Sequence, residues 1–374
     1  MIVGILKEIK SAENRVSMTP AGVETLVQNS HAVLVEKDAG KGTGFTDNDY
    51  VKVGGEIVAS PGEIYKRADM VMHVKEPLPS EYDLIRKDQI IFTFLHLAAN
   101  EKLTRALIKS RSVCIAYETI QKPDGSLPLL TPMSEIAGRL AVQQGAGFLE
   151  MTHGGRGVLL GGVPGVNPGT VVVIGGGTAG INAAKMACGL GAKVYLLEIN
   201  LARLRYLSDV MPKNCFLIMS GPAAIRKFVK KADLVVGAVL SPGAKSPLLV
   251  TRPMLKTMKK GSVIVDIAID QGGCFETSKP TTHIDPVYTI NGVLHYCVAN
   301  IPGAVPITST IALTNATLPY VVEIADKGWK RAARENPSIG SGLNVVDGKV
   351  TCRGVSDAFG LEYIYFESMI ESSL

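Results

Sequence analysis

The sequence feature that most constrains the fold is a glycine-rich turn near the middle of the chain, at residues 175–180 (GGGTAG). An apolar run at residues 171–174 (VVVI) leads directly into it, and an alanine-rich stretch follows at once. The order strand, GxGxxG turn and helix is typical of a nucleotide-binding βαβ unit, because the glycines allow a tight turn and the helix N-terminus offers N–H groups to a phosphate. The sequence therefore predicts a doubly wound α/β domain around this turn.

The acid that ends the next apolar run, Glu198, indicates which nucleotide binds there. A carboxylate at this position accepts hydrogen bonds from the ribose hydroxyls of the adenosine and repels a 2′-phosphate. We therefore expect the cofactor to be NAD rather than NADP, although Arg203 leaves NADP open. The alternative is a glycine-rich turn followed by a solvated acid, and the complete order of strand, turn, helix, strand and acid favours the nucleotide site. The turn residues expected to contact the cofactor are Gly175, Gly177, Thr178, Ala179 and Gly180.

The length of the chain, 374 residues, exceeds what one hydrophobic core usually organises. Short apolar runs alternate with helix-like segments on both sides of a Gly/Pro-rich stretch, the pattern of parallel sheets covered by helices. The predicted fold class is α/β, with two doubly wound Rossmann-like domains, the first discontinuous in sequence. We expect a substrate or catalytic domain at residues 1–131 and 306–374, and an NAD-binding Rossmann domain at residues 132–305.

The expected elements follow from apolar periodicity and from turn and cap signals. Helices are expected at residues 20–28, 132–150 and 309–334, and a hairpin around Asp347 and Gly348. Strands are expected at residues 2–6, 32–36, 70–74, 90–95 and 113–117 of the first domain, and at residues 171–174, 194–197, 216–219, 234–238, 263–267 and 293–298 of the second.

Charge and cysteine usage exclude several classes of protein. The formal net charge is +5 and Lys and Arg form no long run, so we expect no nucleic-acid partner. The six cysteines lie far apart in the sequence, which indicates a reducing compartment and no metal site. The N-terminus lacks the features of a signal peptide, and the uncharged stretch 157–184 is too rich in glycine and proline to span a membrane. We therefore expect a cytoplasmic protein without a membrane partner.

Candidate catalytic residues follow the apolar runs, because ligands of parallel α/β sheets bind beyond the carboxyl ends of the strands. Arg15 comes shortly after the first run, and Lys75 and His96 end two others. An arginine can hold a carboxylate, a lysine can polarise a keto oxygen, and a histidine can shuttle a proton. Together they predict a site for a 2-oxo or 2-amino acid. Asp270, just beyond an apolar run of the second domain, is a further candidate.

Each of these residues also has a purely structural interpretation. Arg15 could form a surface ion pair, Lys75 could be a solvated strand end, and His96 could be a structural histidine. The competing candidates are weaker, because His73 is expected inside a strand and Asp266 inside an apolar run. The interpretation as a site therefore depends on the combination of residues.

Several motifs taken together resemble the alanine dehydrogenases, and the resemblance runs the whole chain. The motifs are residues 7–8 (KE) with 13–16 (ENRV), and residues 74–77 (VKEP), 94–98 (FLHLA), 132–138 (PMSEIAG) and 300–306 (NIPGAVP). The resemblance implies NAD-dependent, reversible oxidative deamination of L-alanine to pyruvate and ammonia, in a homohexamer. It also implies a fold similar to one component of proton-translocating transhydrogenase.

The same resemblance assigns functions to individual residues. It implies that Arg15 and Lys75 bind the substrate, that His96 and Asp270 are catalytic, and that Met133 lies near the substrate methyl group. It implies that the cofactor contacts, besides the glycine-rich turn, Ser134, Glu198, Arg203, Ser220, Val239, Leu240, Ile267, Asp270, Lys279, Val298, Asn300 and Ile301.

The chain departs from the family pattern at three positions. Glu198 stands where Asp is common, Gly176 where Ala is usual, and Ile301 where Met is common. The longer acid at 198 reaches further, which bears on cofactor affinity and leaves the predicted reaction unchanged.

Two other functions are compatible with these motifs. A lysine- or saccharopine-type dehydrogenase shares the plan but needs room for a longer side chain, whereas Met133 and Tyr117 favour a small pocket. An NAD-binding module of a transhydrogenase would carry out no amino-acid chemistry. A comparison of alanine-dependent NADH formation with hydride exchange between nicotinamide cofactors distinguishes an alanine dehydrogenase from a transhydrogenase module.

Overall fold

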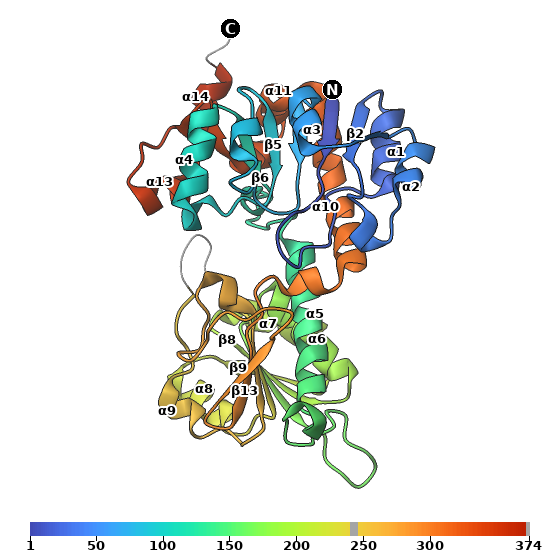
Figure 1. Cartoon of the computed structure of the whole chain (residues 1–374). Helices are drawn as coiled ribbons and strands as arrows, with labels where there is room; N and C mark the ends of the chain where they lie inside the picture. The colour runs from blue at the N-terminus through green and yellow to red at the C-terminus, as the bar shows by residue number, and fades with distance from the viewer. Residues whose placement is uncertain (240–245, 372–374) are drawn as a thin grey trace. The chain divides into compact units, whose positions relative to one another are not determined.

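The computed structural model describes residues 1–239 and 246–371, and the chain forms two compact units. Unit 1 comprises Met1–Met133 and Val305–Leu374, and unit 2 comprises Ser134–Ala304 (Figure 1). The sequence predicted domain boundaries at 131/132 and 305/306. That the discontinuous domain binds the substrate and the continuous one the cofactor stays a prediction.

Unit 1 contains an eight-stranded sheet with the order β15-β14-β6-β5-β4-β1-β2-β3. The strands from β6 to β3 are all parallel. At one edge β14 pairs antiparallel with β6, and β15 pairs antiparallel with β14. The strands are β1 (Ile2–Ile5), β2 (Ala32–Glu36), β3 (Glu56–Val58), β4 (Met70–Met72), β5 (Ile90–Thr93), β6 (Val113–Ala116), β14 (Leu343–Val346) and β15 (Lys349–Val350). The strand order reverses between β1 and β4, and such a switch point is where ligands bind in open α/β sheets.

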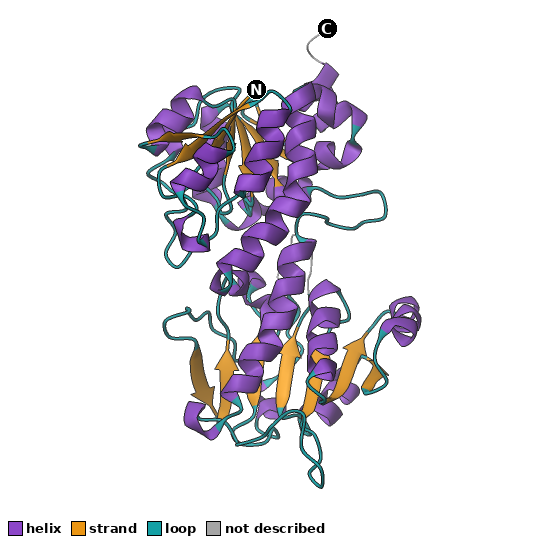
Figure 2. Ribbon diagram, turned by 90° about the vertical axis from the view of Figure 1, so that its right-hand side faces the viewer, coloured by secondary structure: helices purple, strands orange, loops and turns teal. Residues whose placement is uncertain are grey.

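The helices of unit 1 connect these strands and cover the sheet (Figure 2). They are α1 (Pro20–Gln28), α2 (Asp47–Lys52), α3 (Pro61–Arg67), α4 (Glu101–Ser110), α10 (Pro306–Lys327), α11 (Trp329–Glu335), α12 (Pro337–Gly342), α13 (Arg353–Phe359) and α14 (Phe366–Glu371). Helix α1 begins as predicted, with Pro20 in its first turn and the Thr19 side chain accepting a hydrogen bond from the Gly22 N–H. One core forms where apolar strand residues such as Val71 and Ile91 meet α3 and α4.

The C-terminal segment completes unit 1. The predicted helical stretch is divided in two, because Gly328 has a positive φ of 73° between α10 and α11. Strand β14 then pairs with β6, and the predicted hairpin to β15 is confirmed, with Asp347 and Gly348 both at positive φ. The sheet is therefore built from both ends of the chain.

Unit 2 contains a seven-stranded sheet with the order β12-β13-β11-β10-β7-β8-β9, all parallel except β12. Its strands are β7 (Thr170–Ile174), β8 (Lys193–Glu198), β9 (Cys215–Met219), β10 (Leu234–Gly237), β11 (Val263–Asp266), β12 (Val287–Ile290) and β13 (Val293–Tyr296). Its helices are α5 (Thr131–Phe148), α6 (Thr178–Gly189), α7 (Leu201–Val210), α8 (Pro222–Val229) and α9 (Arg252–Leu255). The first turn of α5 belongs to unit 1. The strand order reverses between β7 and β10. The predicted fold class, α/β with two Rossmann-like domains, is confirmed.

Two strands were missed, and one histidine was placed wrongly. Strands β3 and β12 lie at sheet edges and are short or half-exposed, so their apolar pattern is weak. Strand β4 ends at Met72, so the prediction that His73 lies inside a strand was wrong. His73 is the first residue beyond the carboxyl end of β4, on the edge where ligands bind.

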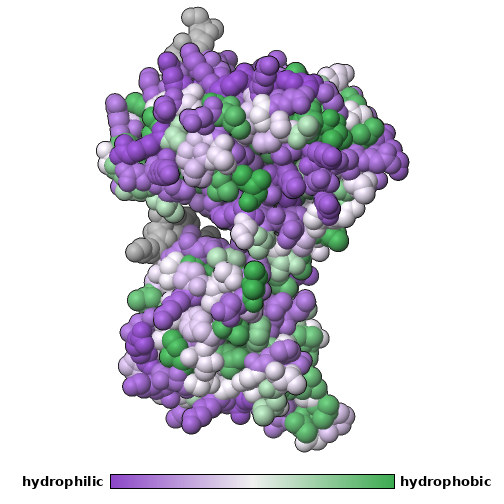
Figure 3. Space-filling view, viewed as in Figure 1, coloured by the Kyte–Doolittle hydropathy of each residue, from purple (hydrophilic) through white to green (hydrophobic). Residues whose placement is uncertain are grey.

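The connection between α5 and β7 exposes apolar side chains. Leu159, Val163 and Val166 are each more than half exposed, and Val163 and Val166 pair across an isolated β-bridge. Figure 3 shows hydrophobic residues gathered at the lower end of unit 2, where this connection lies in the same view of Figure 1. Exposed apolar clusters of this kind often mark contacts with other chains.

None of the helices in the described part of the chain combines the length and apolar composition that crossing a bilayer requires.

The packing of α5 against α6 depends on a glycine. A Cβ atom at Gly138 would collide with the Ala179 carbonyl and lie 3.0 Å from the Ala183 nitrogen, both parts of the backbone. A Cβ atom at Gly147, on the same helix, would meet nothing within 4 Å.

We therefore expect Gly138→Ala to lower the free energy of unfolding by about 1–3 kcal/mol, because the two helices must separate. Gly147→Ala, the matched control, should leave stability unchanged or raise it by up to about 1 kcal/mol, because alanine favours the helix. Urea unfolding of both variants measures the difference. Equal stability of the two variants would contradict the close-packing argument.

Candidate functional site

The glycine-rich turn of unit 2 has the geometry that a dinucleotide site needs. Gly175 has a φ of 104°, which favours glycine, and a Cβ atom there would lie 2.5 Å from the Ala238 carbonyl oxygen. A Cβ atom at Gly180 would collide with the Gly175 carbonyl, whereas one at Gly177 would meet nothing within 4 Å. The first glycine thus permits the turn, the third permits close helix–strand packing, and the second leaves open space at the N-terminus of α6. This cradle fits a pyrophosphate.

Glu198 ends β8 and is tied to the glycine-rich turn. One of its carboxylate oxygens accepts a hydrogen bond from the Gly176 N–H at 2.7 Å, and the other accepts from the backbone N–H groups of Ile199 and Asn200. The Arg203 side chain donates to the Gly176 carbonyl oxygen at 2.9 Å. The acid and the arginine, both predicted cofactor residues, therefore also hold the turn in shape.

Most of the other predicted cofactor residues lie beyond the carboxyl ends of the strands of unit 2. Ser220 follows β9 and donates its N–H to the Glu198 carbonyl oxygen, and Val239 follows β10. Ile267 and Asp270 lie in the 3₁₀ helix η6 (Ile267–Gln271), and Lys279 follows it in the chain. Val298, Asn300 and Ile301 follow β13, and Ser134 lies near the start of α5. Leu240 lies outside the described residues.

A buried carboxylate organises the loop that carries Asp270. Asp266, at the end of β11, is fully buried and accepts hydrogen bonds from the backbone N–H groups of Ala268 and Cys274 and from the Ser278 hydroxyl. Burial raises the pKa of the Asp266 carboxyl, and the hydrogen bonds oppose the shift. Asp270 itself is exposed. Asp266 is therefore the anchor of the loop, a function that its place in an apolar run did not reveal.

Arg15 in unit 1 is buried, so the alternative of a surface ion pair was wrong. Its Nε and Nη2 atoms donate to the two carboxylate oxygens of Glu13 at 2.7 and 2.6 Å, and its Nη1 lies 3.1 Å from the Met133 Sδ. The two-pronged pair with Glu13 fixes the plane of the guanidinium. Two of the predicted substrate residues, Arg15 and Met133, are thus in direct contact.

Lys75 is held through its backbone on both sides. Its N–H lies 3.4 Å from the Glu8 carboxylate, which accepts a shorter hydrogen bond of 2.6 Å from the Val74 N–H. Its carbonyl oxygen accepts a hydrogen bond from the Thr93 hydroxyl at 2.9 Å. Because Glu8 follows β1 and Thr93 ends β5, the segment with Lys75 is fixed to both neighbours of β4.

His96 lies in the loop beyond β5 in a left-handed conformation, with φ 48° and ψ 40°. Its backbone N–H donates to the Glu118 carboxylate at 2.6 Å, and its Nδ1 lies 3.8 Å from the same carboxylate. The ring stacks on Phe94 and about half of the side chain is exposed. Glu118 therefore holds a conformation that a non-glycine residue rarely adopts, and keeps the imidazole at the solvent-facing edge of the sheet.

Tyr117, beyond the end of β6, is fully buried and packs edge-on against Phe92 and Phe94. Its hydroxyl has no hydrogen-bond partner among the described residues. A buried hydroxyl without a partner costs free energy, and this one lies at the same edge of the sheet as the predicted substrate residues.

Three carboxylates to which the sequence assigned no function hold the predicted residues in place: Glu8, Glu13 and Glu118. Glu8 and Glu118 each come shortly after a strand, so the strand-end rule could have found them. They were passed over because their hydrogen bonds join segments that are distant in the chain, and no local pattern shows such a pair.

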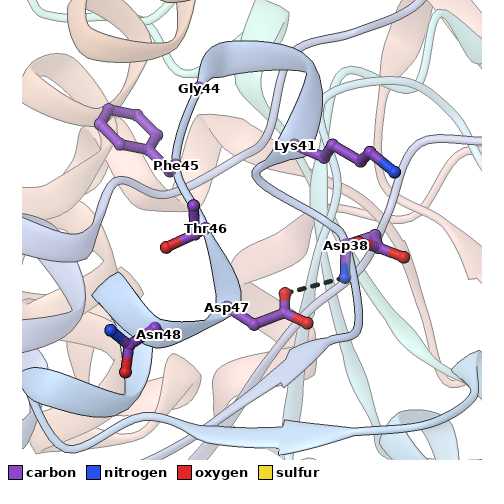
Figure 4. Close-up of a pocket in the computed structure, with 7 residues that line it drawn as sticks. All are labelled: Asp38, Lys41, Gly44, Phe45, Thr46, Asp47 and Asn48. Atoms are coloured by element: carbon purple, nitrogen blue, oxygen red, sulfur yellow. Dashed lines mark hydrogen bonds between the residues drawn. The ribbon is translucent and has the colours of Figure 1, made fainter.

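A pocket of about 370 Å³ lies elsewhere in unit 1, in the loop after β2 (Figure 4). Asp38, Lys41 and Phe45 are among the residues that line it. Its polar groups serve the loop itself, because the Asp47 carboxylate accepts a hydrogen bond from the Asp38 N–H, as Figure 4 shows, and Thr46 caps α2. None of the predicted site residues lines this pocket.

Within residues 1–239 and 246–371, no group of three or more His, Cys, Asp or Glu side chains could hold a metal ion.

The comparisons with known proteins agree along nearly the whole chain. The family models "Alanine dehydrogenase/PNT, N-terminal domain" and "Alanine dehydrogenase/PNT, C-terminal domain" match residues 4–137 and 141–353. An alanine dehydrogenase of Methanococcus maripaludis is 56% identical over 97% of this chain and 98% of its own. Alanine dehydrogenase 2 of Staphylococcus aureus is 55% identical over 99% of this chain and 100% of its own.

Solved structures show the same relationship. An L-alanine dehydrogenase superposes with a TM-score of 0.93 at 52% identity, covering 96% of this chain and 99% of its own. A transhydrogenase from Sinorhizobium meliloti, at 24% identity and a TM-score of 0.81, shares the fold and covers 94% of this chain and 99% of its own. With both family models matched in order and relatives more than half identical over nearly their full length, this chain belongs to the alanine dehydrogenase/PNT family.

Proposed function

We propose that this chain catalyses the reversible NAD-dependent oxidative deamination of L-alanine to pyruvate and ammonia. The observation that carries the proposal is that Lys75 and His96 come just beyond two neighbouring parallel strands, β4 and β5, in a chain whose other sheet carries a dinucleotide turn. The names of relatives that are 55–56% identical over nearly the full chain support the same reaction. The enzyme is thus an oxidoreductase that acts on an amino acid.

The turn of unit 2 and its neighbours would hold the cofactor. The backbone at Gly177 and the first turn of α6 would bind the pyrophosphate, since the N-cap glycine has no side chain to satisfy the N–H groups there. Glu198 would bind the adenosine ribose, because a carboxylate oxygen has room for a second hydrogen bond besides the one from Gly176. Arg203 is engaged with the Gly176 carbonyl oxygen, which favours NAD over NADP.

The substrate-binding residues of unit 1 would orient alanine. Arg15 would bind the carboxylate, with the guanidinium plane set by Glu13. Met133, in contact with Arg15, would pack against the methyl group and limit the pocket to small side chains. Lys75 would bind the 2-oxo oxygen and stabilise the negative charge that develops there. Orientation of this kind contributes a large part of the rate in reactions between two bound molecules.

Two residues would move and direct protons. NAD⁺, when bound, supplies the acceptor for the hydride of the alanine Cα. His96 would take a proton from water as its oxygen bonds to the imino carbon, and return that proton to the nitrogen. As the C–N bond breaks and ammonia leaves, His96 would take the proton of the remaining hydroxyl while the C=O bond of pyruvate forms. Asp270 would orient the water in this direction and the ammonia in the reverse one. The half-exposed ring of His96 can exchange its proton with solvent between turnovers.

The same proposal extends to assembly and location. We propose a homohexamer, supported by the exposed Leu159, Val163 and Val166 between α5 and β7, which an oligomer contact would cover. The cytoplasm is the proposed compartment, since all six cysteines are free thiols in the described structure.

The first test is a panel of amino acids with NAD⁺ or NADP⁺, followed by the absorbance of the reduced cofactor. L-Alanine with NAD⁺ should give the highest kcat/KM, with serine and glycine lower and lysine inactive, because Met133 limits the pocket. A preference for lysine or saccharopine, or activity confined to hydride exchange between nicotinamide cofactors, would reject the proposed reaction in favour of the corresponding alternative.

The second test separates substrate chemistry from cofactor binding. Lys75→Ala should abolish most pyruvate reduction and leave NADH binding intact, because Lys75 belongs to unit 1 and the glycine-rich turn to unit 2. Arg15→Lys should raise the KM for pyruvate. It is preferable to Arg15→Ala, which would remove the charge that the buried Glu13 carboxylate faces, at a cost of about 3–5 kcal/mol. Lys109→Ala, at an exposed position of α4, is the control. Weaker NADH binding by folded Lys75→Ala, measured by fluorescence titration, would refute this division of functions.

The third test concerns the proton carrier. His96→Gln should fold, bind NADH and lose about a hundred- to ten-thousand-fold in turnover, the usual contribution of general acid–base catalysis. His153→Gln, at a half-exposed histidine of unit 2, should keep normal turnover. Turnover and thermal melting are measured together for both variants. If His96→Gln retains near-normal alanine oxidation, or if its loss only follows unfolding, His96 is not the proton carrier.

A further inference from the structure

A charged cluster is buried beneath the switch point of unit 1. The His73 ring lies between two carboxylates, with its Nδ1 3.3 Å from Glu8 and its Nε2 3.1 Å from Glu81. The three side chains are at most 5% exposed. The Tyr65 hydroxyl lies 3.2 Å from the His73 Nε2 and 3.4 Å from the Glu81 carboxylate. The sequence analysis set His73 aside, and the mechanism above uses none of these four residues.

The two carboxylates favour the charged form of the His73 imidazole. Burial lowers the pKa of His73, but its hydrogen bonds to Glu8 and Glu81 outweigh burial and raise the pKa to about 10. The same contact lowers the pKa of Glu81 against the effect of its burial. Of the other groups nearby, Glu36 has a pKa that burial raises, and its carboxylate accepts a hydrogen bond from the Lys7 N–H. His73 is therefore an imidazolium in the pH range in which the enzyme would work.

The pH dependence of this contribution follows from the direction of the shift. The pKa of His73 is higher in the folded protein than the ordinary value of 6.5. The stabilisation is therefore complete below about pH 6.5, where both states are protonated, and is lost as the pH rises through about 10. At neutral pH the charge is still present in the folded protein.

Glu8 links this charge to the predicted substrate residue. Its Oε1 atom faces the His73 Nδ1. The same atom accepts a hydrogen bond of 2.6 Å from the Val74 N–H and a longer one of 3.4 Å from the Lys75 N–H. A carboxylate needs a fixed orientation to hold two backbone donors at once. The His73 ring, whose Nδ1 lies 3.3 Å from the same Oε1 atom, fixes that orientation. On the other side, the Thr93 hydroxyl fixes the Lys75 carbonyl oxygen.

We propose that His73 is a positioning residue for Lys75, acting through the Glu8 carboxylate that binds the backbone at Val74 and Lys75. The proposal rests on the proposed function in that it takes Lys75 as the residue that binds the 2-oxo oxygen. The ammonium group can meet this oxygen reproducibly because its backbone is clamped between Glu8 and Thr93. A displacement of about 1 Å in such a group can cost about a hundred-fold in rate.

His31 provides a matched control within the same unit. It too is a buried histidine with a carboxylate partner, since its Nε2 lies 2.9 Å from Asp326, and its Nδ1 lies 3.3 Å from the N-terminal nitrogen. It precedes β2, and its two ring nitrogens face Met1 and Asp326 rather than Glu8. If buried histidines in this unit serve stability alone, His73→Gln and His31→Gln should have the same kind of effect.

The experiment compares the full-length wild type with His73→Gln, His31→Gln and Thr93→Val. Steady-state kinetics of pyruvate reduction give kcat and the KM values for pyruvate and NADH. Hydrogen–deuterium exchange followed by mass spectrometry measures the backbone amides of residues 73–78. Thr93→Val keeps the shape of a buried side chain and removes only the hydroxyl, so it tests the other half of the clamp if His73→Gln does not fold.

For His73→Gln we expect kcat/KM for pyruvate to fall by about ten- to a hundred-fold, with the KM for NADH unchanged and faster exchange in residues 73–78. Thr93→Val should lower kcat/KM for pyruvate in the same direction, and His31→Gln should change only the melting temperature. Unchanged exchange and unchanged pyruvate kinetics in His73→Gln, or in Thr93→Val if only that variant folds, would overturn the proposal. So would equal effects of His73→Gln and His31→Gln on pyruvate kinetics.

The exchange measurement separates this inference from the proposed function. If the wild type shows no activity with alanine or pyruvate, the proposed reaction fails. The exchange of residues 73–78 still decides whether His73 and Glu8 hold this segment. Faster exchange in His73→Gln and not in His31→Gln would then support the positioning function, and equal exchange would reject it.

Discussion

Parallel pairing of the strands determines where chemistry can take place in this chain. In each sheet the carboxyl ends of the parallel strands lie at one edge. Residues that follow different strands are therefore brought to the same edge, although they are far apart in the sequence. The order of strands reverses once in each sheet, between β1 and β4 and between β7 and β10. Arg15 follows β1 and Lys75 follows β4, on either side of the first reversal, and the glycine-rich turn follows β7 at the second. The order of the strands therefore determines where these residues lie, and their side chains determine what they can do there.

The central strands and the general plan could be predicted because they are apolar, continuous and bounded by glycine or charge. The runs at β7 and β10, buried on both faces, leave no other interpretation. Strands β3 and β12 could not be found in the same way, because edge strands pack on fewer neighbours and carry polar residues. The ends of β4 and β5 were also set too late, since apolar residues continue beyond the last ladder hydrogen bond into the loops that carry Lys75 and His96.

Lys75 and His96 come just beyond the ends of β4 and β5, as the strand-end argument expects, and the buried Arg15 follows β1. That these residues act on the substrate stays a prediction. The carboxylates that fix them, Glu13, Glu8 and Glu118, each bind backbone or guanidinium groups through distances and angles that arise only after folding. A carboxylate after a strand looks the same in the sequence whether it is solvated or bound. What the structure adds to the prediction is therefore mainly the set of carboxylates that hold the predicted residues in place.

The discontinuity of unit 1 has a consequence for synthesis on the ribosome. Strand β6 remains an edge strand until β14 emerges, and the whole of unit 2 is translated between them. Unit 2, whose strands are all contiguous in the chain, can complete its core while unit 1 still lacks two strands and its C-terminal helices. During that interval the N–H and C=O groups along one edge of the apolar strand Val113–Ala116 are open to pairing with other chains. The nascent chain, rather than the finished protein, is thus the form most exposed to aggregation.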